Sequence, residues 1–110
     1  MRSATAIALP KDVTDLVDHI ATTFRPARII LFGSHATGTA GPDSDVDLLV
    51  VTETGGRPLR RAAEIYRTLS HHIAIDILVR SPEQLADPSP RDLILTEILR
   101  QGVTVYEAGH

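Results

Sequence analysis

The sequence contains no cysteine and no tryptophan, and aromatic residues make up only 4% of its 110 positions. The absence of cysteine excludes a disulfide framework and any zinc site built on thiolates. No apolar run approaches the roughly 20 residues that a membrane-spanning helix needs. The apolar stretch 4–9 is also too short and too weak for a secretory signal peptide. We therefore expect a cytoplasmic protein without a membrane segment.

A strong excess of charge of either sign is missing as well. The chain carries 11 Lys and Arg against 14 Asp and Glu, which gives a net charge of −3. There is thus no global electrostatic basis for binding nucleic acid. The hydrophobic fraction of 43% and the charged fraction of 23% are typical of a globular protein. The length predicts a single domain over residues 1–110 with one core.

Periodicity predicts an alternation of helices and strands. Apolar residues at helical spacing and Ser-Pro sequences that resemble helix starts indicate the helices. Apolar and β-branched runs indicate the strands. The expected helices cover residues 10–24, 58–70 and 93–101, the last of them preceded by a helix start at Ser89. Two short helical segments are expected as well, one starting at Ser81 and one capped by Ser34 and reaching about Gly38. The expected strands cover residues 27–32, 45–52, 73–79 and 103–106. This order predicts an α/β (α+β) fold class with a small mixed β-sheet flanked by helices.

The stretch 31–50 concentrates residues that a fold alone does not require. Asp45 and Asp47 are two positions apart on an expected strand, so their side chains should point to the same side. Two such carboxylates repel each other unless a cation lies between them or one takes up a proton. Hard oxygen ligands of this kind suit Mg²⁺. Taken alone, however, the pair is better explained as the solvated start of a strand after a turn.

Two further features favour the interpretation of that pair as part of a metal and phosphate site. Gly33-Ser34 at a strand end offers close backbone approach, amide donors and a hydroxyl to a phosphate, although a plain turn is the alternative. Asp76 lies inside the apolar run 73–79, where a carboxylate is costly unless an arginine, a hydrogen bond or a metal compensates it. If the two Asp-bearing strands are neighbours, three carboxylates form a cluster that could hold two metal ions.

The combination resembles a known family. Gly33-Ser34, ten intervening residues, Asp45-Val46-Asp47 and a later Asp76 on an apolar strand are similar to the polymerase-β-type nucleotidyltransferase superfamily. Within it, the chain resembles the minimal nucleotidyltransferase (MNT) family over about residues 28–107. The resemblance implies a nucleotidyltransferase-like fold.

It also implies roles for these residues. Gly33 and Ser34 would hold the β- and γ-phosphates of a nucleoside triphosphate, with ATP as the expected donor. Asp45 and Asp47 would bind two Mg²⁺ ions, and Asp76 would ligate one of them and help to activate the acceptor hydroxyl. That hydroxyl would attack the α-phosphorus, so that a nucleoside monophosphate is transferred and pyrophosphate leaves.

The chain departs from the family pattern in its basic residues. Many relatives carry Arg directly after Gly-Ser and again two residues later, where this chain has His35 and Thr37. The loss of positive charge could weaken triphosphate binding unless other residues replace it. The candidates by charge are Arg57, Arg60 and Arg61. A solvated helix face is the competing interpretation of that cluster.

Small size and family resemblance suggest the acceptor. Stand-alone minimal nucleotidyltransferases resemble antitoxins paired with HEPN-type toxins, in which AMP is attached to a toxin tyrosine. We therefore expect a protein adenylyltransferase-like enzyme with a HEPN-type toxin as partner. A small-molecule acceptor such as an aminoglycoside and a binding-only antitoxin are the alternatives. Neither a nucleic-acid nor a membrane partner is expected, and a homo-oligomer is left open.

Overall fold

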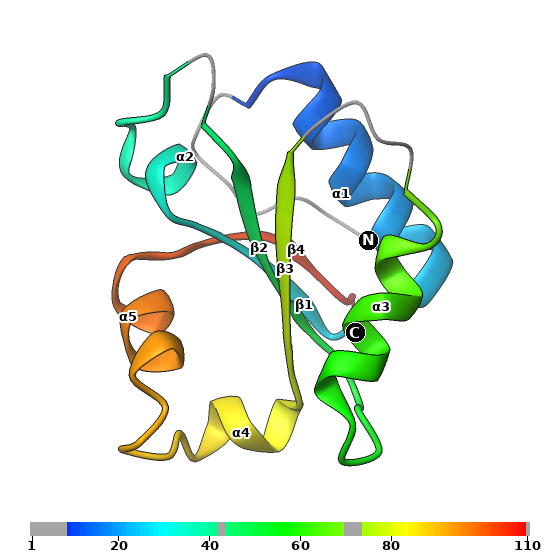
Figure 1. Cartoon of the computed structure of the whole chain (residues 1–110), viewed down its shortest axis with the longest axis vertical. Coiled ribbons are helices and arrows are strands. Elements are labelled where there is room, and N and C mark those ends of the chain that lie inside the picture. Colours follow the sequence, from blue (N-terminus) through cyan, green and yellow to red (C-terminus); the bar gives the residue numbers. More distant parts are fainter. Residues whose placement is uncertain (1–8, 42–43, 70–73, 110) are drawn as a thin grey trace.

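The computed structural model describes residues 9–41, 44–69 and 74–109. All four expected strands are present, displaced at their ends by one or two residues. The elements follow one another as α1 (Lys11–Phe24), β1 (Arg28–Phe32), α2 (Ser34–Thr37), β2 (Val46–Val51), α3 (Pro58–Tyr66), β3 (Ile75–Arg80), α4 (Pro82–Ala86), α5 (Leu93–Gln101) and β4 (Val103–Glu107) (Figure 1).

The strands form one sheet in the order β3-β2-β1-β4. β1 pairs antiparallel with both β2 and β4, whereas β2 and β3 run parallel. The mixed sheet that the sequence predicts is therefore confirmed. The two strands that carry the acidic residues, β2 and β3, are direct neighbours.

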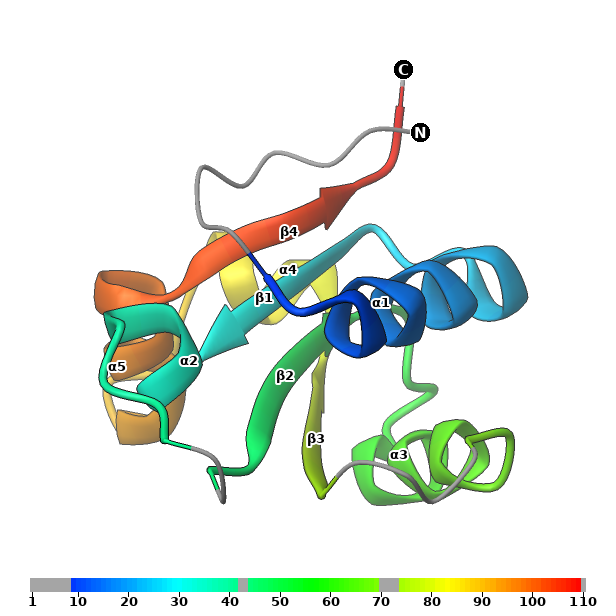
Figure 2. The same ribbon diagram turned by 90° about the horizontal axis from the view of Figure 1, so that it is seen from above.

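Helices α1 and α3 cover one face of this sheet (Figure 2). Val13, Val17 and Ile20 line the buried side of α1, because residues three or four apart share a helix face. They pack against alternate residues of the strands, among them the fully buried Leu31 and Leu48. The amphipathic pattern of the sequence thus places the larger core between α1, α3 and the sheet.

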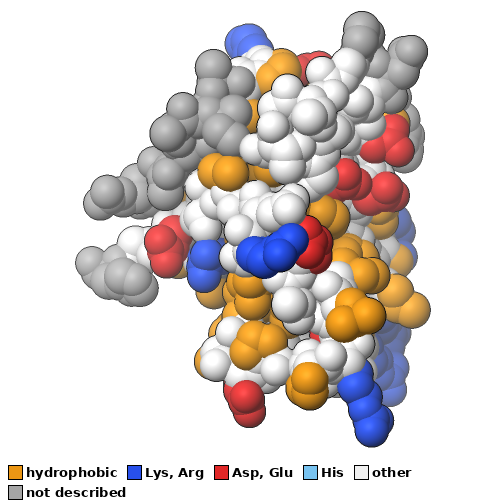
Figure 3. Space-filling view, turned by 90° about the vertical axis from the view of Figure 1, so that its left-hand side faces the viewer, with side chains coloured by type: hydrophobic (Ala, Val, Ile, Leu, Met, Phe, Trp, Pro, Cys, Tyr) orange, Lys and Arg blue, Asp and Glu red, His pale blue; other side chains and the backbone are white. Residues whose placement is uncertain are grey.

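Helix α5 covers the opposite face with a smaller core. Its buried residues Leu95 and Ile98 pack with Ile30, Leu49 and Val51 of the strands. Part of the outer side of α5 is apolar and open to solvent, with Leu93 73% and Ile94 54% exposed. Figure 3 shows hydrophobic side chains gathered on this side of the molecule.

The structure confirms one predicted helix start and corrects another. The start at Ser81 is confirmed, because its hydroxyl accepts from the Gln84 amide and the Gln84 side chain accepts from the Ser81 amide. The expected Ser89 start is wrong, since α5 is capped by Asp92, whose carboxylate accepts from the Leu95 amide at 3.1 Å. The residues from Ser89 to Asp92 form a turn instead, in which the Asp92 amide donates to the Ser89 carbonyl at 3.0 Å.

Helix α3 ends at Tyr66, and the chain continues as a turn rather than a helix up to residue 69. The remaining end of the predicted helix, residue 70, and the start of the predicted strand at residue 73 lie outside the described residues. Among the residues that are described, no helix has both the length and the apolarity to cross a membrane.

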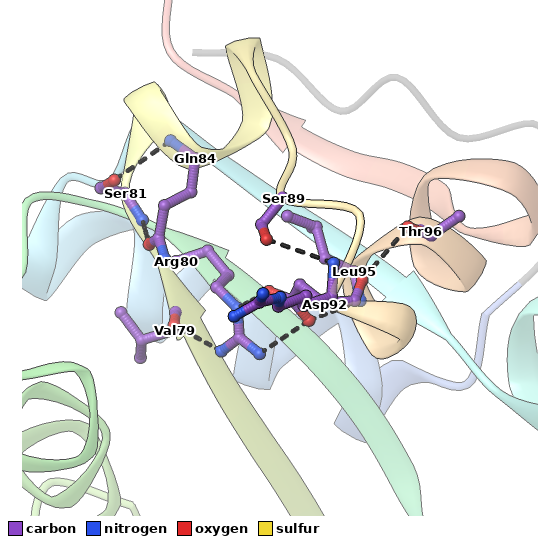
Figure 4. Close-up of polar contacts among 9 residues, drawn as sticks. Val79, Arg80, Ser81, Gln84, Ser89, Asp92, Leu95 and Thr96 are labelled. Carbon is purple, nitrogen blue, oxygen red and sulfur yellow. Dashed lines mark hydrogen bonds and ion pairs between the residues drawn. The ribbon is translucent and has the colours of Figure 1, made fainter.

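An ion pair joins the end of β3 to the start of α5 (Figure 4). Arg80 donates from Nε to one oxygen of Asp92 at 2.8 Å and from a terminal nitrogen to the other at 3.3 Å. The two side chains are only 19% and 18% exposed, so water screens the pair poorly. The hydrogen bond to Arg80 is the main cause that lowers the pKa of Asp92 below its usual range. Asp92 therefore both caps α5 and anchors it to the sheet.

Replacing Asp92 by Asn should remove the charge and keep the cap, because Asn caps helices about as well as Asp. We expect Asp92→Asn to lower the free energy of unfolding by about 1 kcal/mol at pH 7. Since the folded-state pKa of Asp92 is lowered, its contribution is present above the unfolded pKa and is lost as pH falls through the folded one. Urea unfolding at pH 7 and near pH 3 measures both effects.

The matched control is Asp15→Asn, which breaks an ion pair to Lys11 of the same 2.8 Å length but with both side chains largely exposed. It should cost under about 0.5 kcal/mol, because solvent screens exposed pairs. Equal losses for the two variants, or a loss at Asp92 that persists at acid pH, would contradict this account.

Candidate active site

The register of the sheet places two carboxylates side by side. In the parallel pairing of β2 with β3, Asp47 is the register partner of Asp76. Register partners on neighbouring strands point to the same face of a sheet. Leu49, two residues after Asp47, packs in the core under α5, so both carboxylates lie on the α5 face. The condition that the sequence sets for a carboxylate cluster, that these two strands be neighbours, is met.

The other expected acidic residue lies differently. β2 begins at Val46, so Asp45 precedes the strand and its side chain is exposed. Asp76 is exposed too, although its apolar flanks suggested burial. It is the second residue of an edge strand, and a carboxylate at that position keeps access to water. The expectation of a buried, costly charge at Asp76 is therefore wrong, while its alignment with Asp47 remains.

Gly33 is fitted against the Asp47 side chain. Its φ of +74° lies in a region that L side chains rarely adopt. A Cβ added there would overlap the Oδ2 atom of Asp47. Phe32, the last residue of β1, pairs with Asp47 across the antiparallel ladder, and Gly33 follows it directly. Glycine is thus required twice at this position, for its backbone conformation and for the room that the carboxylate occupies.

The short helix α2 follows directly, and it differs from the expectation in one detail. Gly33, not Ser34, is the N-cap residue, and its carbonyl accepts from the amides of Ala36 and Thr37. Ser34 is the first helical residue, and its carbonyl accepts from the Thr39 amide at 3.0 Å. The backbone groups of α2 therefore bond to one another, and Gly33 places the start of this short helix next to the Asp47 carboxylate.

The two positions where relatives carry Arg have separate surroundings. Nε2 of His35 lies 3.4 Å from the Ser44 carbonyl oxygen, which joins α2 to the segment before β2. The Thr37 hydroxyl lies 3.0 Å from that of Thr39 and faces its own turn. Of these two residues, His35 is the one whose charge acts on Asp47.

Burial raises the pKa of the Asp47 carboxyl above its usual range, and the negative charges of Asp76 and Asp45 raise it further. The charge of His35 acts in the opposite direction and lowers this pKa. The net shift is upward, so repulsion and burial outweigh the one basic group that acts on Asp47. An added cation would relieve this repulsion.

The oxygen donors suit a hard divalent cation such as magnesium. Mg²⁺ commonly binds through one or two carboxylates and takes its other ligands from phosphates and water. Asp47 and Asp76 supply such a pair, with Asp45 close enough for its charge to shift the pKa of Asp47. Over residues 9–41, 44–69 and 74–109, no three His, Cys, Asp or Glu side chains form a ready metal-ligand group. Water or phosphate oxygens would supply the remaining ligands.

The arginine cluster lies elsewhere. Arg57 and Arg60 are exposed, and Arg61 pairs with Glu64 at 3.0 Å on the surface of α3. Since α3 covers the face of the sheet opposite to Asp47, these residues do not line the carboxylate pair. Their interpretation as a solvated helix face fits the structure.

Comparison with known proteins identifies the class. Residues 13–98 match the family model for the nucleotidyltransferase domain, so the chain belongs to this family. No curated protein matches the chain.

Two solved structures share the fold. A Sulfolobus solfataricus protein classed as a nucleotidyltransferase has a TM-score of 0.61 and 18% identity, over 86% of this chain and 77% of its own. A toxin–antitoxin structure with AMP-PNP has a TM-score of 0.57 and 20% identity, over 86% of this chain and 73% of its own. At this identity the likeness establishes the α+β fold, and the nucleotidyltransferase-like fold expected from the sequence is confirmed.

The contact between Gly33 and Asp47 can be tested with a matched pair of glycines. Gly38 also has a positive φ, of +80°, but an added Cβ there meets nothing within 4 Å. Gly38→Ala should cost roughly 1–2 kcal/mol of unfolding free energy for the backbone alone. We expect Gly33→Ala to cost about 1–3 kcal/mol more, because it also forces the Asp47 side chain to move.

Urea unfolding of both variants gives these differences. In an Asp47→Ala background, the cost of Gly33→Ala should fall, since the overlapping carboxylate is gone. It should stay above that of Gly38→Ala, because Gly33 combines its positive φ with a ψ of −155°, a conformation essentially confined to glycine, whereas Gly38 is left-handed helical. An unchanged cost in that background would show that Gly33 does not support the Asp47 carboxylate.

Proposed function

We propose that the chain is a Mg²⁺-dependent nucleotidyltransferase that transfers AMP from ATP to a hydroxyl group of a partner protein. The observation that carries the proposal is the register pair Asp47–Asp76 beside Gly33, in a chain of the nucleotidyltransferase domain family. Such a pair of carboxylates suits the divalent ions that phosphoryl-type transfer uses. The proposed reaction class therefore agrees with both the geometry and the family.

In this proposal Asp45, Asp47 and Asp76 hold two Mg²⁺ ions, which would offset the negative charge on the phosphate oxygens during transfer. Gly33 and Ser34 bind the β- and γ-phosphates, where the turn into α2 brings backbone close to the carboxylates. Asp76 accepts the proton of the acceptor hydroxyl as its oxygen forms a bond to the α-phosphorus. The bond from that phosphorus to the bridging oxygen breaks, and pyrophosphate leaves.

The proposed acceptor is a tyrosine of a HEPN-type toxin, which makes the chain an antitoxin of the MNT type. A fold neighbour described as a toxin–antitoxin with AMP-PNP supports a toxin as the partner protein. It also supports ATP as the donor, because AMP-PNP is an analogue of ATP. A small-molecule acceptor such as an aminoglycoside is the second candidate within the same chemistry. A binding-only antitoxin would need none of the three carboxylates.

The test is label transfer from ATP that carries radioactive phosphorus at the α-position, with Mg²⁺ and the protein encoded by the neighbouring gene. The wild-type chain should label that protein. Asp47→Asn and Asp76→Asn should lower the labelling rate at least about 100-fold, because each removes a proposed metal ligand. Asp18→Asn, which changes an exposed carboxylate on α1, is the matched control and should leave the rate unchanged.

Other outcomes assign the alternatives. If the Asp47 and Asp76 variants neutralise the toxin fully and no label is transferred by any form, the chain is a binding-only antitoxin. Labelling of aminoglycosides but of no protein favours the small-molecule enzyme. Labelling that persists in both variants would contradict the proposed site.

A further inference from the structure

The strand that carries Asp76 is the outermost strand on its side of the sheet. Among the described residues, β3 pairs with β2 alone, so every second residue of β3 turns its backbone amide and carbonyl away from the sheet. The Ala74 carbonyl accepts from the Val46 amide at 2.9 Å, which sends the backbone of Asp76 toward β2 as well. The backbone groups of Ile75 and Ile77 therefore point to the outer edge.

One tyrosine hydroxyl bonds both of those outward residues. The Tyr66 hydroxyl accepts from the Ile77 amide at 2.7 Å and donates to the Ile75 carbonyl at 3.3 Å. These two groups flank Asp76 on either side along the chain. Asp76 is thus held by β2 on one edge and bracketed by the Tyr66 hydroxyl on the other.

The position of Tyr66 is itself well supported. Tyr66 is the last residue of α3, and its ring packs against the larger core. The preceding Ile65 is fully buried and anchors the helix to the sheet. The hydroxyl thus comes from a packed helix, and it bonds backbone groups at the outer edge of β3 as a neighbouring strand would. Strand ends and edges open more readily than the interior of a sheet.

We propose that Tyr66 is a positioning residue for Asp76. By bridging Ile75 and Ile77, its hydroxyl keeps the first residues of β3 from separating from the sheet and so holds the Asp76 carboxylate beside Asp47. This inference rests on the proposed function, because it assigns to that placement a role in binding the divalent cation. Tyr66 does not contact the cation or the reacting atoms in this account.

The experiment compares Tyr66→Phe with Tyr106→Phe and the wild-type chain. Tyr66→Phe keeps the ring in the core and removes only the bridging hydroxyl. Tyr106 is the other tyrosine of the chain, buried on β4 at the opposite edge of the sheet, and it controls for the general loss of a tyrosine hydroxyl. The first readout is the affinity for Mn²⁺ without nucleotide, measured from the signal of free Mn²⁺ in electron paramagnetic resonance. The second is hydrogen exchange of the Ile77 amide.

We expect Tyr66→Phe to weaken Mn²⁺ binding about three- to tenfold, less than the loss of a direct partner of a metal ligand. The Ile77 amide should exchange faster, and the Tyr106 variant should match the wild type in both readouts. A purely stabilising role for Tyr66 would lower the thermal midpoint and leave Mn²⁺ affinity within twofold of the wild type, and that result overturns the proposal. Unchanged exchange at Ile77 overturns it too.

Failure of the proposed function gives a different result. If the wild-type chain binds no Mn²⁺, the carboxylate pair is not a cation site, and the positioning role falls with it. If the wild type binds Mn²⁺ and Tyr66→Phe binds it equally well, only the role of Tyr66 is rejected.

Discussion

The repulsion between two carboxylates held side by side is the constraint on which this site depends. Parallel pairing of β2 with β3 leaves Asp47 and Asp76 no other arrangement, because they are register partners on one face. Burial of Asp47 and the negative charge of Asp76 both raise the pKa of the Asp47 carboxyl. The apolar residues that alternate with these carboxylates fill the cores on both faces and keep the strands in register. The folding energy of the sheet therefore maintains an unfavourable contact that a bound cation would turn into a favourable one.

Much of this arrangement could be predicted from the sequence, because the features that specify it are local. The apolar runs identify the strands, and the capping sequence at Ser81 identifies the start of α4. Prediction was wrong where two local solutions compete. Ser89 has the same form of helix start, yet Asp92 caps α5 because its carboxylate also pairs with Arg80, which is distant in sequence.

Contacts across the sheet could be predicted only in part. The sequence indicates only that the three carboxylates cluster if the two Asp-bearing strands are neighbours. The exposure of Asp76 follows from its place near the end of an edge strand, and hydrophobic periodicity does not show which strand lies at the edge. The overlap that a side chain at Gly33 would make with Asp47 requires the fold. The role of Tyr66 also requires the fold, because the sequence indicates only a residue on the apolar side of a helix. Its hydroxyl gains a role only when α3 packs beside β3.

The most direct measurement of the central claim is anomalous diffraction from a crystal of the wild-type chain grown with Mn²⁺ and a non-hydrolysable ATP analogue. Manganese stands in for magnesium and can be located without reference to the protein. The account predicts an anomalous peak between the carboxylates of Asp47 and Asp76, with the nucleotide phosphates next to Gly33. A nucleotide bound elsewhere, or manganese absent from the two carboxylates while the nucleotide is present, would contradict it.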